Sequence, residues 1–401
     1  MEKEKEVEWT EATTKEEFYK QVDEWLLRRQ KQVGEVHIPQ LGVWPPDPRV
    51  SFVAGLNNEL VTADLIRHYA DAIGDKNPLW RSEEYARRTR WGGIIAPPTF
   101  MDCIAPTFVG SGRDYPRGMR PLVAGAKRTW FQVMRPGDKI HCIDKYLGVE
   151  EKKKEDRPYR LFVETTRRTY INQREEVVAI ADSPIVTVAA GSLEETKSAY
   201  PFRERTKYSQ KELNRIHHAY ETETRRGAEV LFWEDVVVGE ELTPIVAGPL
   251  DATDNASFIA ALQYIPAFGL KWDMMKADLS WCTVDPETNE YHFGDETHLV
   301  DWIARLRVGA NAYGLGAMSE GLVCHLITNW MGDDGFLKRL ECRQRRLNHL
   351  GDVSWMKGKV TKKYIDNGEH LVDLEVYCQN QVNIIHTDGT ATVRLASKED
   401  L

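Results

Sequence analysis

Apolar residues near the start of the chain recur at helical spacing. They form one stripe made of Phe18, Val22, Trp25 and Leu26. Thr13 or Thr14 is suited to cap the start of this helix, and Gly34 to close its end. Prolines crowd residues 39–48, which predicts an extended connection. We therefore predict an N-terminal helical arm with a Pro-rich connection over residues 1–50.

A different period appears near the C-terminus. Every second residue is apolar over a short run that contains Val372, Leu374, Val376 and Cys378. This alternation predicts a half-buried β-strand. By contrast, Ile66, Ala70 and Ile73 belong to a helix of small and apolar residues, which suits the inside of a curved sheet. The pattern favours an α+β fold in which antiparallel sheet wraps a helix.

The same order of elements occurs twice. Each copy opens with an apolar helix, LVTADLIRHYADA in the first and LDATDNASFIAAL in the second. A Gly-Asp pair follows after an irregular stretch, in GDKI and GDVS, and an Asn-Gln pair lies further on. The repeat indicates two similar domains that join edge to edge into one long sheet, hiding two open edges.

The two copies are separated by a polar stretch dense in charges of both signs. Ser209 and Glu212 form a capping box there, which predicts a helix within the linker. We predict an N-terminal domain over residues 51–191, a charged helical linker over 192–228, and a C-terminal domain over 229–401.

Composition narrows the possible functions. The chain has 401 residues, with 42% hydrophobic residues and 12 Trp, which argues against disorder. Its net charge of -9, without a basic stripe, argues against nucleic acid as a partner. No apolar run reaches the 18 or more residues expected of a membrane span. The charged start, MEKEKEVEW, has no apolar signal-peptide core, so we expect a cytoplasmic protein.

Several kinds of chemistry have no support in the sequence. The six cysteines occur singly and form no CxxC pair, which argues against a zinc ribbon or a thioredoxin-like site. There is no P-loop, no Rossmann glycine set and no serine nucleophile elbow. Neither a metal nor a redox cofactor is expected.

One segment carries a resemblance to a known family. The residues YADAIGDKNPLW from Tyr69 to Trp80, followed by Tyr85-Ala86 and GIIAP ending at Pro97, resemble the hydratase motif of MaoC-like dehydratases. The linker phrases RGA, WEDV, GEEL and GPL between 226 and 250 are similar to those of two-domain members. The resemblance implies a double hot-dog fold, with an antiparallel sheet around a long helix in each domain.

The resemblance also implies an activity. Family members add water reversibly to trans-2-enoyl-CoA thioesters and give 3-hydroxyacyl-CoA products, here by analogy the (R) product. An Asp–His pair holds and deprotonates the water and returns a proton to the α-carbon. A backbone N–H at a helix start stabilises the thioester enolate oxygen. The thioester itself acidifies the α-proton, so no cofactor is implied.

The first domain departs from the family at one position. Asp75 and Asn77 of the motif are in place, but Trp80 stands where the family has its histidine. In one interpretation this segment is now a helix-ending turn, for which Asp, Asn and Pro are suited. In the other, Asp75 still takes part in catalysis and the Trp80 indole packs beside the acyl chain or the adenine.

The second domain offers a replacement histidine. Ala304 follows His298 at the same offset of six residues at which Ala86 follows Trp80. We therefore predict His298 as the general acid–base, against the simpler interpretation of a structural histidine. Its carboxylate partner is expected to be Asp295, or Glu296. The family spacing of that pair is not kept, because an insertion over residues 264–297 precedes His298.

The remaining predicted site residues concern the thioester and coenzyme A. Tyr313, Gly314 and Gly316 match the family's oxyanion turn, although an ordinary turn has the same composition. Arg345 and Arg346 are predicted to bind the coenzyme A phosphates. Other cations considered for that role are Lys127, Arg128, Arg135, Arg343, Lys357 and Lys359.

The favoured interpretation is thus an acyl-CoA hydratase or dehydratase, expected to form a homo-oligomer. One alternative is a non-catalytic acyl-CoA binder or a subunit of a larger assembly, and another is a hot-dog thioesterase. The insertion contains Trp272, Met274, Met275 and Trp281, which suggests a bulky acyl group, a lid or a dimer contact.

Overall fold

The computed structural model describes residues 14–39, 56–106, 115–116, 118–153, 157–192, 202–263, 267–277 and 282–400, with positions 195, 197, 199 and 200. Its α-helices are α1 (Lys15–Lys31), α2 (Ala63–Ala72), α3 (Glu83–Ala86), α4 (Met101–Ile104), α6 (Gln210–Glu221), α7 (Ala252–Leu262), α8 (Phe268–Ala277), α9 (Asp301–Val308) and α10 (Gly316–Met331). Short 3₁₀ turns that matter below are η1 (Pro78–Trp80), η2 (Pro98–Phe100) and η5 (Gly294–His298).

The strands divide into a first-domain set and a second-domain set. The first set is β1 (Val36–His37), β2 (Met119–Val123), β3 (Gly125–Trp130), β4 (Ile140–Glu151), β5 (Arg160–Asn172) and β6 (Val177–Ala189). The second set is β7 (Ile245–Ala247), β8 (Cys282–Val284), β9 (Tyr291–Phe293), β10 (Phe336–Gln344), β11 (Ser354–Asp366), β12 (Glu369–Asn380) and β13 (Ile385–Arg394).

Eleven strands form one continuous sheet that runs through both domains. The order is β1-β4-β5-β6-β3-β10-β13-β12-β11-β7, with β2 also paired to β6, and β3 and β10 pair antiparallel where the domains meet. Gly125 lies at this junction with φ +121°, and a Cβ there would lie 2.0 Å from the carbonyl oxygen of Cys342. The edge-to-edge junction therefore requires glycine at this position.

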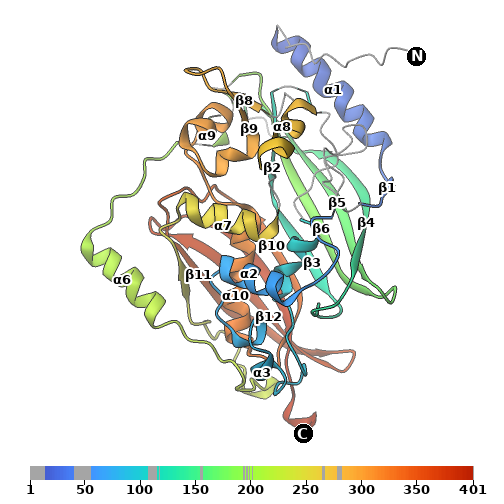
Figure 1. Cartoon of the computed structure of the whole chain (residues 1–401), viewed down its shortest axis with the longest axis vertical. Helices are drawn as coiled ribbons and strands as arrows, with labels where there is room; N and C mark the ends of the chain where they lie inside the picture. The colour runs from blue at the N-terminus through green and yellow to red at the C-terminus, as the bar shows by residue number, and fades with distance from the viewer. Residues whose placement is uncertain are drawn as a thin grey trace.

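The helix enclosed by the sheet in the second domain is α10. Residues 317–331 of α10 are all buried, and the helix packs against β3 and β10–β13. Our expectation that the opening helix of each copy is wrapped was wrong, because α2 and α7 pack against each other instead (Figure 1). Asp64, His68 and Asp71 give α2 a solvent-exposed polar face, whereas α10 is buried on all sides.

The internal repeat extends to individual hydrogen bonds. In the first domain, the amide of Gln173 donates to the Asp138 carboxylate, and its carbonyl oxygen accepts from the N–H of the residue after that aspartate. In the second domain, the amide of Gln381 likewise donates to the Asp352 carboxylate, and its carbonyl oxygen accepts from the N–H of Val353. The Gly-Asp and Asn-Gln pairs of the repeat thus tie the same turn to the same hairpin in each domain.

The arm and the linker form their predicted helices. Thr14 caps α1, whose buried face contains Phe18, Val22 and Trp25. The Ser209–Glu212 capping box starts α6, which stands at the side of the molecule in Figure 1. The insertion forms α8 and the β8–β9 hairpin. The prolines after position 39, Trp281 and the Met274 side chain lie outside the described residues.

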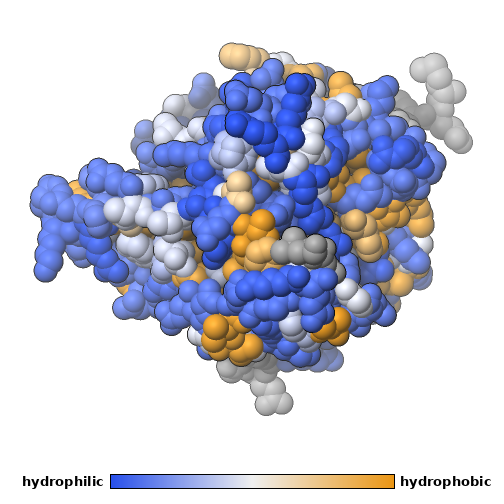
Figure 2. All heavy atoms as spheres, turned by 90° about the horizontal axis from the view of Figure 1, so that it is seen from below, coloured by the Kyte–Doolittle hydropathy of each residue, from blue (hydrophilic) through white to orange (hydrophobic). Residues whose placement is uncertain are grey.

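The surface that faces the viewer from below is mostly hydrophilic, and its apolar residues gather in separate small patches (Figure 2). Within the described part of the chain, no helix combines the length and the apolarity that crossing a bilayer requires.

Candidate active site

A cavity of about 640 Å³ lies between the two domains and the linker. Strands β2, β5 and β6 form part of its wall, and Tyr200, Phe202 and Arg203 of the linker form another part. The second domain contributes η5, the start of α10 and the segment 344–349. The predicted site residues that line the cavity are Asp295, His298, Tyr313, Gly314, Gly316, Arg345 and Arg346.

His298 is held in one tautomer. Its Nδ1 lies 2.9 Å from the carbonyl oxygen of Tyr313, which can only accept, so Nδ1 carries the proton and Nε2 keeps its lone pair. The Tyr313 ring packs edge-on against the imidazole, with ring centroids 4.8 Å apart. Burial lowers the pKa of His298, while Asp295 and the bond to Tyr313 oppose that effect. His298 is therefore a neutral base at physiological pH.

Asn255 on α7 fixes the two segments that meet at this imidazole. Its side-chain amide donates to the carbonyl oxygens of His298, at 2.6 Å, and Tyr313, at 3.2 Å, and its side chain is fully buried. Sequence reasoning missed this residue. The signal available was a lone amide on the buried face of an otherwise apolar helix.

The two candidate carboxylates lie in different surroundings. Asp295 is 9% exposed, lines the cavity and acts electrostatically on His298. Glu296 instead lies 2.9 Å from His292 and 3.2 Å from Lys271, and it does not line the cavity. The structure thus places Asp295, and not Glu296, beside the imidazole.

The start of α10 supplies backbone donors to the cavity. Within the described residues, the N–H groups of Gly316 and Ala317 have no hydrogen-bond acceptor, as expected for the first turn of a helix. Gly314 does not share this property, because its N–H donates to the carbonyl oxygen of Asn348 at 2.7 Å. Of the two predicted oxyanion glycines, Gly316 has a free donor and Gly314 has not.

The cavity is rich in arginine. The arginines in its lining are Arg120, Arg157, Arg203, Arg307, Arg345 and Arg346. Arg345 is ion-paired with Asp388 at 2.7 Å. Arg346 is exposed and has no carboxylate within ion-pair distance in the described part of the chain. Arginines outnumber the one carboxylate of the lining, Asp295, which favours an anionic ligand.

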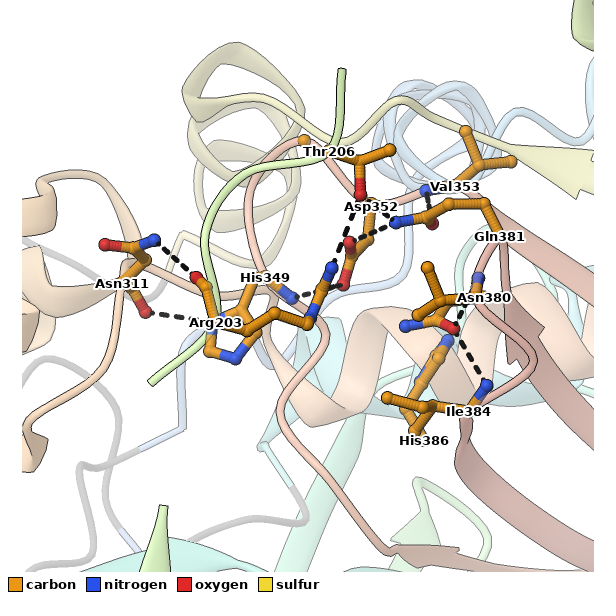
Figure 3. Close-up of polar contacts among 12 residues, drawn as sticks. Arg203, Thr206, Asn311, His349, Asp352, Val353, Asn380, Gln381, Ile384 and His386 are labelled. Carbon is orange, nitrogen blue, oxygen red and sulfur yellow. Dashed lines mark hydrogen bonds and ion pairs between the residues drawn. The ribbon is translucent and has the colours of Figure 1, made fainter. Parts of the chain in front are cut away.

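A polar network anchors the linker beside the cavity (Figure 3). Arg203 forms an ion pair with Asp352, and the same carboxylate accepts from Gln381 at 2.7 Å and from the backbone N–H of His349 at 3.2 Å. The His349 ring bonds to the carbonyl oxygen of Asn311 and also lines the cavity. Sequence reasoning missed Arg203 and His349, although His349 lies just ahead of the repeated Gly-Asp pair.

The large apolar residues of the insertion are not part of this site. Trp272 on α8 is 54% exposed, and Met275 is buried. Neither lines the cavity.

Comparison with known proteins shows what parts of the chain are similar to. Residues 50–181 match the family described as FAS1-like, dehydratase domain region. A probable enoyl-CoA hydratase alpha subunit from Thermomonospora curvata is 32% identical over 135 residues, which cover 30% of this chain and 42% of that protein. A UPF0336 protein from Thermobifida fusca is 35% identical over 88 residues, covering 20% of this chain and 57% of that protein. The chain thus spans about half the length of the curated relatives it matches.

Solved structures show the fold. A MaoC-like dehydratase superimposes with a TM-score of 0.60 at 16% identity, over 92% of this chain and 99% of that one. In its fold the chain is similar to MaoC-like dehydratases. A double hot-dog protein from Mycobacterium tuberculosis matches with a TM-score of 0.50 at 11% identity, over 90% of this chain and 96% of that one. The predicted α+β double hot-dog fold is confirmed.

The motif of the first domain is closed by hydrogen bonds to the Asp75 carboxylate. The Trp80 indole N–H donates to the Asp75 carboxylate at 2.8 Å, and the backbone N–H of Asn77 donates to the other oxygen at 2.9 Å. All three residues are at most 2% exposed and lie outside the large cavity. Both oxygens of the Asp75 carboxylate thus accept from protein donors, and the Trp80 indole, unlike an imidazole, cannot accept a proton from water.

The two domains can be aligned through this motif. Ala96 follows Trp80 by 16 residues and donates to the carbonyl oxygen of Met134 at 2.9 Å. Gly314, which follows His298 by the same 16 residues, donates the corresponding bond to the carbonyl oxygen of Asn348. Trp80, Ala96 and Met134 line a cavity of only about 30 Å³, which is the filled counterpart of the large one.

Proposed function

We propose that the chain is a hydratase that adds water reversibly to a trans-2-enoyl-CoA thioester and gives a 3-hydroxyacyl-CoA. The observation that carries the proposal is the juxtaposition, in one cavity, of a neutral imidazole with a fixed tautomer and a helix start with free N–H groups. The base suits activation of water, and the helix start suits a developing oxyanion.

The proposed reaction uses one base and one oxyanion site. Nε2 of His298 takes a proton from water as the water oxygen attacks the β-carbon. The electron pair of the double bond moves to the thioester oxygen, where the N–H groups of Gly316 and Ala317 stabilise the enolate. The imidazolium then returns the proton to the α-carbon on the same face, which gives syn addition. Asp295 stabilises the imidazolium.

The arginines support a coenzyme A thioester as the substrate form. Arg346 and Arg157 line the cavity without a carboxylate within ion-pair distance in the described part of the chain, and both are suited to bind phosphate. The apolar side chains that β2, β5 and β6 contribute to the lining would hold the acyl group. The predicted homo-oligomer and the predicted cytoplasmic location stay predictions.

The test is a spectrophotometric assay with a panel of enoyl-CoA thioesters, short to aromatic. We expect the absorbance of the conjugated double bond to decline without release of free thiol. His298→Gln should lower turnover by about 10²–10⁴. His292→Gln is the matched control, since His292 bonds to Glu296 outside the cavity, and it should retain turnover.

Each alternative has its own result. Release of thiol would establish a thioesterase. No reaction, with CoA thioesters still raising the unfolding temperature, would favour the acyl-CoA binder. Full turnover in a folded His298→Gln variant would refute the assignment of the base.

A further inference from the structure

One buried amide beside the cavity has no use in the fold. Asn348 is 9% exposed, lines the cavity, and its Oδ1 is buried without a hydrogen-bond partner. Its Nδ2 makes no hydrogen bond to the described residues and, unlike Oδ1, is not fully buried. No side-chain hydrogen bond within the described protein therefore holds this amide, and its Nδ2 is free to donate to a ligand in the cavity.

The amide lies beside the start of α10. A Cβ on Gly314 would be 3.7 Å from Nδ2 of Asn348, and Gly314 precedes the first residue of α10 by two positions. The backbone bond from Gly314 to the Asn348 carbonyl fixes the segment that carries the side chain. The amide therefore borders the same space as the free N–H groups of Gly316 and Ala317.

The internal repeat shows that the fold does not need an amide here. In the first domain, the residue that accepts the corresponding backbone bond is Met134, whose side chain is buried and apolar. That domain has Trp80 where the second has His298, and its cavity is filled. The unpaired amide thus occurs in the domain that has the histidine and the open cavity, and an apolar side chain takes its position in the other domain.

We propose that Asn348 is a catalytic residue whose Nδ2 donates a hydrogen bond to the thioester oxygen, alongside the N–H groups at the start of α10. This inference rests on the proposed use of the cavity for an enoyl-CoA thioester. Asn348 replaces the donor that Gly314 cannot offer, since the N–H of that glycine is already engaged. The hydrogen bond strengthens as negative charge develops on the oxygen, so it acts mainly on the transition state.

A spectroscopic test isolates this bond from the proton transfer. The inactive His298→Ala variant is saturated with 3-phenylpropenoyl-CoA, a chromophoric enoyl thioester whose absorbance moves to longer wavelength when its carbonyl is polarised. We expect a red shift on binding that is reduced when Asn348→Ala or the isosteric Asn348→Asp is added. Asn214→Asp, which places the same charge on the exposed face of α6, should leave the shift intact.

Turnover gives the second readout. With His298 present, Asn348→Asp should lower kcat by about 10²–10³, with a smaller effect on KM. An undiminished red shift in both Asn348 variants, with the ligand bound, would overturn the proposal. A red shift that depends on Asn348 in a protein that hydrates no enoyl-CoA would support this inference while refuting the proposed function.

Discussion

Replacing Arg128 by Met tests how the two domains are held together. Arg128 on β3 of the first domain is fully buried between Asp102, at 3.1 Å, and Glu320 on α10 of the second domain, with which it is also ion-paired. Removing one partner from such a buried set leaves uncompensated charge and typically costs about 3–5 kcal/mol. We expect Arg128→Met to lower the free energy of unfolding by that amount at pH 7.5.

The pH dependence of this loss can be worked out. Burial already raises the pKa of Glu320, against the lowering effect of Arg128. Without the guanidinium, Glu320 should take up a proton on folding, which costs about 1.4 kcal/mol for each pH unit above its unfolded value near 4.3. The folded pKa of the variant is thus raised. Its stability, relative to the native protein, should recover as the pH falls from 7.5 toward 5.

Urea unfolding of both proteins across that pH range measures the difference. Arg167→Met is the matched control, because Arg167 pairs with Asp182 on the exposed side of the same sheet and should contribute about 1 kcal/mol or less. Arg128→Lys keeps a charge and should retain part of the stability. A loss for Arg128→Met that stays constant with pH, or that matches the control, would refute the reasoning.

Three further predictions concern the site. Because the pKa of His298 is lowered and the base must be neutral, kcat/KM should rise with pH along a limb whose midpoint lies below pH 6.5, and the limb should vanish in His298→Gln. Asp75→Asn should leave turnover unchanged, yet lower stability by about 1–3 kcal/mol in a denaturation assay, because its amide would face the Trp80 N–H; a large loss of turnover would return Asp75 to the chemistry. Arg346→Gln should raise KM for CoA thioesters roughly fivefold, which corresponds to about 1 kcal/mol of binding free energy, at unchanged kcat. An effect that does not weaken with added salt would contradict phosphate binding.

Local patterns were sufficient to predict much of the fold. The capped helix of the arm, the capping box of the linker and the alternating strand β12 all follow from neighbours within a few residues. Which helix the sheet encloses depends instead on comparing whole helices. The acidic residues Asp64 and Asp71 of α2 indicate a helix with a solvent-exposed face. The small residues Ala70 and Ala72 instead led to the prediction that the sheet encloses this helix.

The site could be predicted only where a motif spans it. His298 and Asp295 lie close in the chain, and the offset from His298 to Ala304 repeats that from Trp80 to Ala86 in the first domain. Asn255, Arg203 and Asn348 come from segments far apart, and only the folded chain brings Arg203 and Asn348 to the cavity lining and Asn255 to the carbonyl oxygen of His298. An arginine on a strand gives no local sign of its direction. For this reason the sequence did not show that Arg128, considered for phosphate binding, is buried in ion pairs with Asp102 and Glu320.

The two related cavities differ in volume, about 640 Å³ against about 30 Å³, and this difference predicts how many ligand molecules one chain binds. A chain built from two copies of one domain offers, by its internal symmetry, two equivalent places for a ligand. Here an indole, Ala96 and Met134 occupy one of them and leave about 30 Å³. Titration calorimetry should therefore find one equivalent of acyl-CoA for each chain and a single class of sites. In the proposed function the first domain serves as a scaffold, and it contributes to the site through the wall that β2, β5 and β6 form in its neighbour's cavity.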